Sequence, residues 1–216
     1  MDNNYTHVSI LIDKSGSMSG SESDVIGGIN KFIEQQKTVP GKLTVSLVQF
    51  DNLYEQMYGF EDIDSVKPLN DDSYIPRGST ALLDAAGRLV TETGLKLSFL
   101  PEALRPSKVM FLIYTDGYEN SSKEWTKPKL DNLIKEQKEK YSWDFVFLGA
   151  DITKEETGVS YGALHGLSSS ASINKNKTLQ AYTMLSEKFT QYRNAPTREA
   201  GSVAMDFSPE DEKALA

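Results

Sequence analysis

Residues 7–18 read HVSILIDKSGSM, a short apolar run that stops abruptly at a loop of aspartate, serine and glycine. A buried parallel strand has this pattern, with aliphatic residues in succession and a loop directly after them. Beyond the loop, Val25 and Ile29 lie at helical spacing, and Ser23 or Asp24 is suited to cap that helix. The stretch therefore predicts a strand, a polar loop and a helix, which is the opening unit of an α/β fold.

The rest of the chain continues this alternation of strands and helices. Residues 43–50 and 53–60 flank the turn-forming pair Asp51-Asn52, so we expect a hairpin whose second strand is an antiparallel edge. The alternation predicts the α/β class, with a doubly wound, mostly parallel central sheet and helices on both faces. The remaining predicted elements are a helix over 78–97, a central strand over 107–114, a helix over 127–140, a strand over 143–148, a helix beginning near 151–155 and a last helix over 176–193.

Length and composition limit the classes of protein that fit this chain. Its 216 residues suit one domain, which we expect to cover residues 1–193, followed by a polar, poorly ordered tail over 194–216. The absence of cysteine excludes disulfides, thiolate zinc sites and cysteine nucleophiles. The net charge of −8 and the lack of a basic stripe argue against binding to nucleic acid. No apolar run suits a signal peptide or a membrane span, so we expect a soluble, cytoplasmic protein without a membrane partner.

Oxygen-bearing side chains follow or adjoin the predicted strands in three separate segments. Because the carboxyl ends of parallel strands meet at one edge of a sheet, we expect these segments to lie together. Alternate residues of an extended turn point the same way, so the first segment can aim three side chains at one point. An all-oxygen set suits a hard cation such as Mg²⁺, with Mn²⁺ or Ca²⁺ as other possibilities. The predicted metal-site residues are Asp13, Ser15, Ser17, Thr80 and Asp116.

Each segment alone also has an ordinary structural interpretation. Aspartate and serine favour turns after strands, Thr80 could cap a helix, and Asp116-Gly117 could be a simple turn. Asp84 is expected to be a carboxylate in the first turn of a helix and not a metal ligand. The occurrence of all three segments in order, each beside a predicted strand, favours a metal site over three unrelated turns.

The strings DKSGSM, STALLDA and YTDGYENSS resemble the metal-ion-dependent adhesion site of von Willebrand factor type A domains, which have a Rossmann-like fold. The resemblance covers residues 5–165 and is closest to short, stand-alone cytoplasmic forms from bacteria and phages, including those near tellurite-resistance proteins. It implies that Ser15 and Ser17 bind the metal directly, and Thr80 directly or through water. It also implies that Asp13 and Asp116 act mainly through water and hydroxyl groups, with one coordination position left for an acidic group of a partner.

These features predict a metal-dependent protein-binding module that binds an aspartate or glutamate of a partner protein, and not an enzyme. Gly16, Gly117 and Glu119 are weaker candidates for contact with that partner. A structural or assembly protein, in which the metal only stabilises the fold, is the alternative. A metal-dependent phosphohydrolase fits less well, because Ser15 stands where phosphatases of the haloacid dehalogenase class have a second aspartate.

Overall fold

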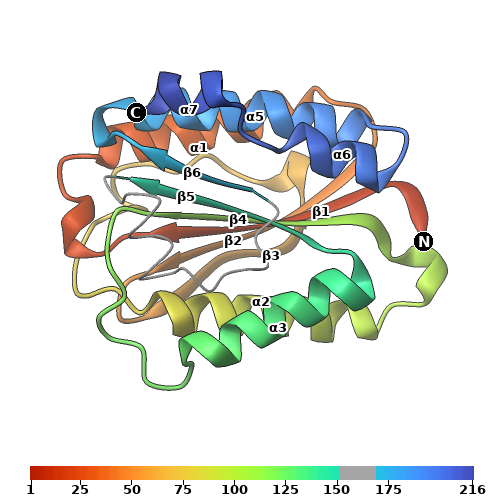
Figure 1. Ribbon diagram of the computed structural model, residues 1–216, viewed down its shortest axis with the longest axis horizontal. Helices are drawn as coiled ribbons and strands as arrows, with labels where there is room; N and C mark the ends of the chain where they lie inside the picture. Colours follow the sequence, from red (N-terminus) through yellow and green to blue (C-terminus); the bar gives the residue numbers. More distant parts are fainter. Residues whose placement is uncertain (151–168) are drawn as a thin grey trace.

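The central feature of the computed structural model, which describes residues 1–150 and 169–216, is a six-stranded sheet in the order β3-β2-β1-β4-β5-β6 (Figure 1). Neighbouring strands pair in parallel except for β2 and β3, which form an antiparallel hairpin at one edge. The predicted α/β fold, mostly parallel sheet and antiparallel edge strand are therefore confirmed. The strands are β1 (Asp2–Asp13), β2 (Lys42–Phe50), β3 (Tyr54–Asp62), β4 (Pro106–Thr115), β5 (Asp144–Ala150) and β6 (Ser169–Ile173).

Helices cover both faces of the sheet, as the alternating sequence predicts (Figure 1). Successive residues of β1 serve the two faces in turn: Ile10 and Ile12 join one buried cluster, whereas Leu11 joins the other. The first cluster lies beneath α1, α5, α6 and α7, and the second beneath α2 and α3. The helices are α1 (Glu22–Lys37), α2 (Leu82–Ser98), α3 (Lys127–Tyr141), α5 (Thr178–Asn194), α6 (Arg198–Ala204) and α7 (Pro209–Leu215).

Some element boundaries differ from the sequence-based expectation. Helix α1 begins at Glu22 with Ser21 as its N-cap, ahead of the predicted caps Ser23 and Asp24. Strand β6 was not predicted, because its sequence SSASI is short and has no apolar run. It nevertheless pairs in parallel with β5, which shows that an edge strand needs little local signal once a neighbouring strand offers its backbone. The helix predicted near 151–155 lies outside the described residues.

Residues 194–216, expected to be a poorly ordered tail, are folded against the domain. Helix α7 starts with a capping box at Ser208, and the side chains of Met205 and Leu215 are fully buried. The carbonyl of Leu215 also accepts a hydrogen bond from the backbone N–H of Asn174 at 2.8 Å. The expectation of disorder was therefore wrong, because two buried apolar side chains anchor an otherwise polar segment.

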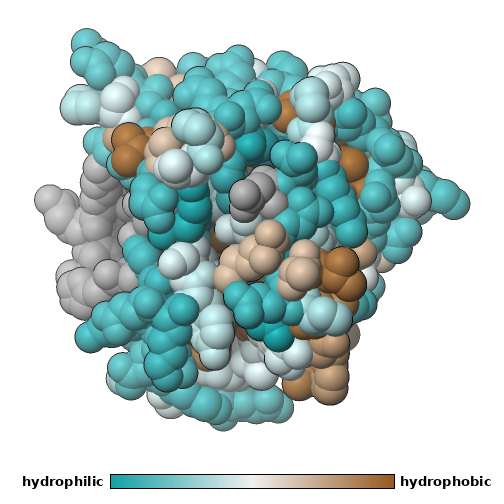
Figure 2. Space-filling model, turned by 90° about the vertical axis from the view of Figure 1, so that its right-hand side faces the viewer, coloured by the Kyte–Doolittle hydropathy of each residue, from teal (hydrophilic) through white to brown (hydrophobic). Residues whose placement is uncertain are grey.

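The strand order places β1 and β4 side by side in the middle of the sheet. From β1 the chain passes through α1 to β2 on one side, and β4 lies on the other side, so the loops after β1 and β4 diverge. Such a switch point is where open α/β sheets bind ligands. The end of the molecule away from the loops after β1 and β4 shows a mostly hydrophilic surface with small apolar patches (Figure 2). In the described residues, no helix is long and apolar enough to cross a membrane.

Candidate metal centre

The three segments with oxygen-bearing side chains meet at the carboxyl ends of the central parallel strands. Asp13 is the last residue of β1, and Thr115 is the last residue of the adjacent β4. The third segment, residues 78–81, leads directly into α2. Its link to the first segment is a hydrogen bond of 3.1 Å from the N–H of Gly16 to the carbonyl of Gly78. The sheet topology therefore brings together residues that are about a hundred positions apart.

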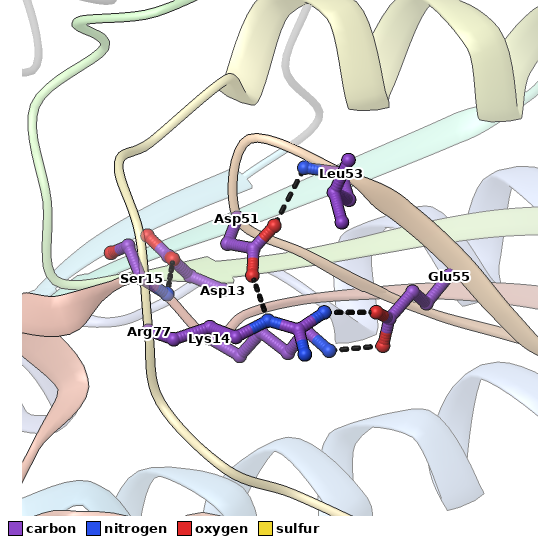
Figure 3. A network of polar contacts seen from close by, with 7 residues as sticks. All are labelled: Asp13, Lys14, Ser15, Asp51, Leu53, Glu55 and Arg77. Atoms are coloured by element: carbon purple, nitrogen blue, oxygen red, sulfur yellow. Dashed lines mark hydrogen bonds and ion pairs between the residues drawn. The ribbon is translucent and has the colours of Figure 1, made fainter.

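A chain of hydrogen bonds joins the site residues of β1 and β4. Oδ1 of Asp13 accepts the backbone N–H of Ser15 at 2.7 Å (Figure 3), and its Oδ2 accepts the hydroxyl of Thr115. The hydroxyls of Ser15 and Ser17 are 3.0 Å apart, and Ser17 donates to Oδ1 of Asp116 at 2.7 Å. Both carboxylates thus orient hydroxyl groups, which agrees with the roles that the family resemblance implies.

Gly117 shows that the oxygens of all three segments surround one point. A β-carbon added to this glycine would lie 3.0 Å from Oγ1 of Thr80, 3.2 Å from Oγ of Ser17 and 3.5 Å from Oδ2 of Asp13. Any side chain at this position would therefore crowd the hydroxyl oxygens of Thr80 and Ser17 and would touch the carboxylate of Asp13. The predicted site residues are brought together, and the glycine beside them leaves the space open.

The site is closed toward the sheet and open toward solvent. Asp13 is 0 % exposed, Ser15 is 1 % exposed and Thr80 is 2 % exposed, whereas Ser17 is exposed and Asp116 is partly exposed. A cation held here would have protein oxygens beneath it and a side that a partner could reach.

Burial changes the protonation of Asp13. It raises the pKa of this carboxyl group from 3.8 to about 6, although the hydrogen bonds from Thr115 and Ser15 oppose the rise. An ionised carboxylate in this position is costly without a compensating positive charge. A divalent cation would supply that charge, so the environment of Asp13 fits a cation site.

The donor types also fit a hard divalent cation. Two carboxylates and three hydroxyls offer only oxygen, which Mg²⁺ and Ca²⁺ prefer and which does not suit zinc. In the part of the chain that the structure describes, no group of three or more carboxylate, imidazole or thiolate side chains could hold a metal. The candidate site differs from such groups because its additional donors are the hydroxyls of Ser15, Ser17 and Thr80.

Thr80 is held in place by its backbone and does not cap the helix. Its N–H donates to Oδ1 of Asn120 at 2.9 Å, and its carbonyl accepts the N–H of Asn120 at 3.0 Å. The N-cap of α2 is Ala81, and the N–H of Leu83 in the first turn donates to Oε2 of Glu119. The helix-cap interpretation of Thr80 is therefore wrong.

The structure gives Glu119 and Asp84 local roles that the sequence did not reveal. Besides accepting the N–H of Leu83 at the start of α2, Glu119 accepts the N–H groups of Ser121 and Ser122, so its oxygens hold both the helix start and the loop. Its contact with a partner stays a prediction. Asp84 accepts three N–H groups from residues 123–125 and fixes the next part of that loop. The hydroxyl of Tyr74 donates to the carbonyl of Asp13 at 2.6 Å. Except for Ser121 and Ser122, these partners are distant in sequence, and no local motif predicts them.

Comparison with known proteins gives a result for the fold alone. No family model matches the chain, and no curated protein sequence matches it. Among solved structures it is similar to proximal thread matrix protein 1 from the mussel byssus, at 15% identity over 93% of this chain and 46% of that chain, with a TM-score of 0.55. It is also similar to a von Willebrand factor type A protein from Catenulispora acidiphila, at 16% identity over 93% of this chain and 43% of that chain, with a TM-score of 0.56.

A third similar structure is the von Willebrand factor domain of the type V pili tip protein Mfa5 from Porphyromonas gingivalis. The identity is 10%, the match covers 84% of this chain and 94% of that chain, and the TM-score is 0.56. The chain spans less than half of the first two structures and nearly all of the third. The chain therefore has the fold of von Willebrand factor type A domains, which confirms the fold that the sequence motifs implied.

Proposed function

We propose that this protein is a divalent-metal-dependent binding module whose metal takes an acidic side chain of a partner protein as a ligand. The observation that carries the proposal is the convergence of oxygens from Asp13, Ser17 and Thr80 around the space beside Gly117. Mg²⁺ is the proposed metal, with Mn²⁺ and Ca²⁺ as substitutes, because the donors are few, small and built from oxygen.

The division of labour among the site residues supports a partner carboxylate as the missing ligand. In this proposal Ser15, Ser17 and Thr80 contact the metal, while Asp13 and Asp116 hold hydroxyl and N–H groups by the hydrogen bonds described above. Neutral hydroxyl ligands leave most of the positive charge of the cation uncompensated. A carboxylate from a partner would then be bound strongly on the solvent side, where Ser17 is exposed.

We propose binding and not catalysis as the activity of the site. Ser17 donates its hydroxyl to Asp116 and contacts the hydroxyl of Ser15, and among the described residues no histidine lies beside these serines to activate a nucleophile. The one histidine among the described residues is His7, and its buried ring forms hydrogen bonds with Thr44 and Ser9 within the sheet. A metal-dependent phosphohydrolase activity that Asp13→Asn abolishes would contradict this part of the proposal.

The metal is tested by chemical unfolding of the full chain in Mg²⁺ and in chelator. At a Mg²⁺ concentration a hundred times its dissociation constant, linkage predicts a stabilisation of about 2.7 kcal/mol. Asp13→Asn should remove that stabilisation, while Asp71→Asn, which changes an exposed loop carboxylate, should keep it. A wild-type protein whose stability does not respond to Mg²⁺, Mn²⁺ or Ca²⁺ would overturn the metal site.

The partner is tested by affinity capture from the native host in Mg²⁺ and in chelator, with the bound proteins identified by mass spectrometry. We expect a partner retained only in Mg²⁺, whose binding is lost when one of its exposed aspartates or glutamates is replaced by the amide. Light scattering examines the structural alternative, because an oligomer that persists in chelator would favour an assembly role.

A further inference from the structure

Four charged side chains form a network on the side of the site next to the β2–β3 hairpin (Figure 3). Arg77 donates from Nε to Oδ2 of Asp51 at 2.9 Å, and its Nη2 pairs with Oε1 of Glu55. The Nζ of Lys14 pairs with the other oxygen of Glu55. The network joins the end of β1, the turn after β2, the edge strand β3 and the loop before α2.

Two members of this network are buried, which distinguishes it from ordinary surface ion pairs. Asp51 is 0 % exposed and Lys14 is 4 % exposed, whereas Arg77 and Glu55 are partly open to solvent. Exposed ion pairs contribute little, but a buried charge left without its partner is strongly destabilising. Arg77 and Glu55 therefore supply the opposite charges for the buried Asp51 and Lys14.

Backbone hydrogen bonds connect the network to the segment that carries Thr80. The N–H of Arg77 donates to the carbonyl of Lys14 at 2.8 Å, directly after the end of β1. On the other side of Thr80, the N–H of Ala81 donates to the carbonyl of Asp51 at 2.9 Å. In addition to the hydrogen bonds of Thr80 to Asn120, its segment is thus attached at two points, and the side chain of Arg77 ties those points together through Asp51.

We propose that Arg77, with Asp51, Glu55 and Lys14, is a positioning network that sets the place of the Thr80 hydroxyl relative to Ser15 and Ser17 and thereby the metal affinity. The inference rests on the proposed metal-binding function. Arg77 itself is a cation and cannot be a ligand, so it acts only through the segment that it holds.

The sign of the effect separates positioning from simple electrostatics. Arg77 carries a positive charge, so its removal would raise the affinity for a divalent cation if charge alone mattered. Positioning gives the opposite result, because a loosened Thr80 segment no longer presents its hydroxyl in a fixed place. Supporting residues that orient metal ligands typically change affinity by about 10- to 100-fold.

The experiment is calorimetric titration of the full chain with Mg²⁺ at constant ionic strength, using wild type, Arg77→Ala and Arg88→Ala. Arg88 is the matched control, because it is 56 % exposed on α2 and pairs with Glu92 at 2.7 Å. We expect Arg77→Ala to weaken Mg²⁺ binding by about tenfold or more, and Arg88→Ala to leave binding unchanged or slightly tighter. Arg77→Lys keeps the charge but loses the planar fork, so it should also weaken binding, by less.

Two outcomes would overturn the inference, and a third would overturn the proposed metal-binding function as well. Mg²⁺ binding by Arg77→Ala as tight as that of wild type would show that Arg77 does not position the site. Unfolding in chelator provides a second measurement: a loss of stability in Arg77→Ala with an unchanged dissociation constant would assign Arg77 to the fold alone. A wild-type protein that binds no metal would instead contradict the proposed function together with this inference.

Discussion

At the scale of single residues, the candidate metal centre depends on which oxygens are left available by their neighbours. Glu119 and Asp84 are carboxylates close to the site, and both accept hydrogen bonds from backbone N–H groups. Thr80 differs from these two residues. Ala81 is the N-cap of α2 and Glu119 accepts the N–H of Leu83, so the hydroxyl of Thr80 is not used as a helix cap and can face the site. Competition for N–H groups at the start of α2 therefore decides which residues can serve a cation.

Gly117 offers the most direct residue-scale test of the site. Gly117→Ala would place a methyl group 3.0 Å from Oγ1 of Thr80 and 3.2 Å from Oγ of Ser17. We expect a folded protein that is less stable by about 1–2 kcal/mol and whose thermal midpoint no longer responds to Mg²⁺.

The matched control for this substitution is Gly27→Ala in α1, where the added carbon would meet nothing nearer than 3.9 Å. Alanine is the better helix former by about 1 kcal/mol, so this variant should be more stable and keep its response to Mg²⁺. An undiminished Mg²⁺ response in Gly117→Ala would place the metal elsewhere.

His7 predicts a dependence of stability on pH that is separate from the metal site. Its ring is fully buried, stacks on Phe60 at 3.7 Å and has its pKa lowered from 6.5 to about 3, mainly by burial. Below pH 6.5 His7 is protonated in the unfolded chain but stays neutral in the folded protein. The free energy of unfolding therefore falls as the pH drops from 6.5 toward 3. Between pH 7.5 and 5.5 the loss from this residue alone should be about 1.4 kcal/mol.

The measurement is urea unfolding in chelator at both pH values for wild type and His7→Gln. Asp13, whose raised pKa makes the metal-free fold less stable as the pH rises toward 6, contributes equally to both proteins. The difference between the two pH dependences therefore reports His7. Identical dependences in wild type and variant would contradict a histidine that stays neutral in the folded state.

At the scale of elements, the C-terminal helices complete the layer that covers one face of the sheet. Helix α6 is tied to β5 by the ion pair of Arg198 with the buried Asp144 at 2.9 Å. Helix α7 contributes Leu215 to the buried cluster of α1 and α5, and Lys177 donates to the carbonyl of Ala214 at 2.9 Å. These contacts make the last residues part of the core and not an appendage.

Leu215→Ala tests this role of the C-terminal helices. Removing a fully buried leucine should lower the free energy of unfolding by about 2–5 kcal/mol, although the residue is next to the last in the chain. Val203→Ala on α6 is the control, because Val203 is 69 % exposed and its loss should cost about 0.5 kcal/mol or less. Urea unfolding in chelator measures both variants. If Leu215→Ala and Val203→Ala were equally stable, residues 194–216 would be a loosely attached tail.

At the scale of the whole molecule, the five candidate metal residues gather at one edge of the sheet. The loops after β1 and β4 diverge there, and the segment before α2 closes the third side of the site. The opposite edge, seen in Figure 2, is mostly hydrophilic with small apolar patches, and it contains none of the five candidate metal residues. A ligand that binds at one edge should therefore affect that edge first.

Hydrogen exchange with and without Mg²⁺ should show this localisation. We expect slower exchange of amides in residues 13–17, 77–81 and 115–120, with little change in residues 99–105 at the other edge. Protection spread evenly over the sheet would contradict a local site and would favour a metal that only stabilises the fold.

The sequence by itself predicted the α/β class, the order of most elements and five candidate site residues, which the structure brings together. Apolar periodicity encodes strands and helices locally, and parallel strands necessarily bring the ends of β1 and β4 to one edge. The tertiary structure decided the contacts of Arg77 and Glu119, the pairing of β6 and the folding of residues 194–216 into helices packed on the domain. These depend on hydrogen bonds, ion pairs and burial between segments far apart in the chain, which no local pattern of residues records.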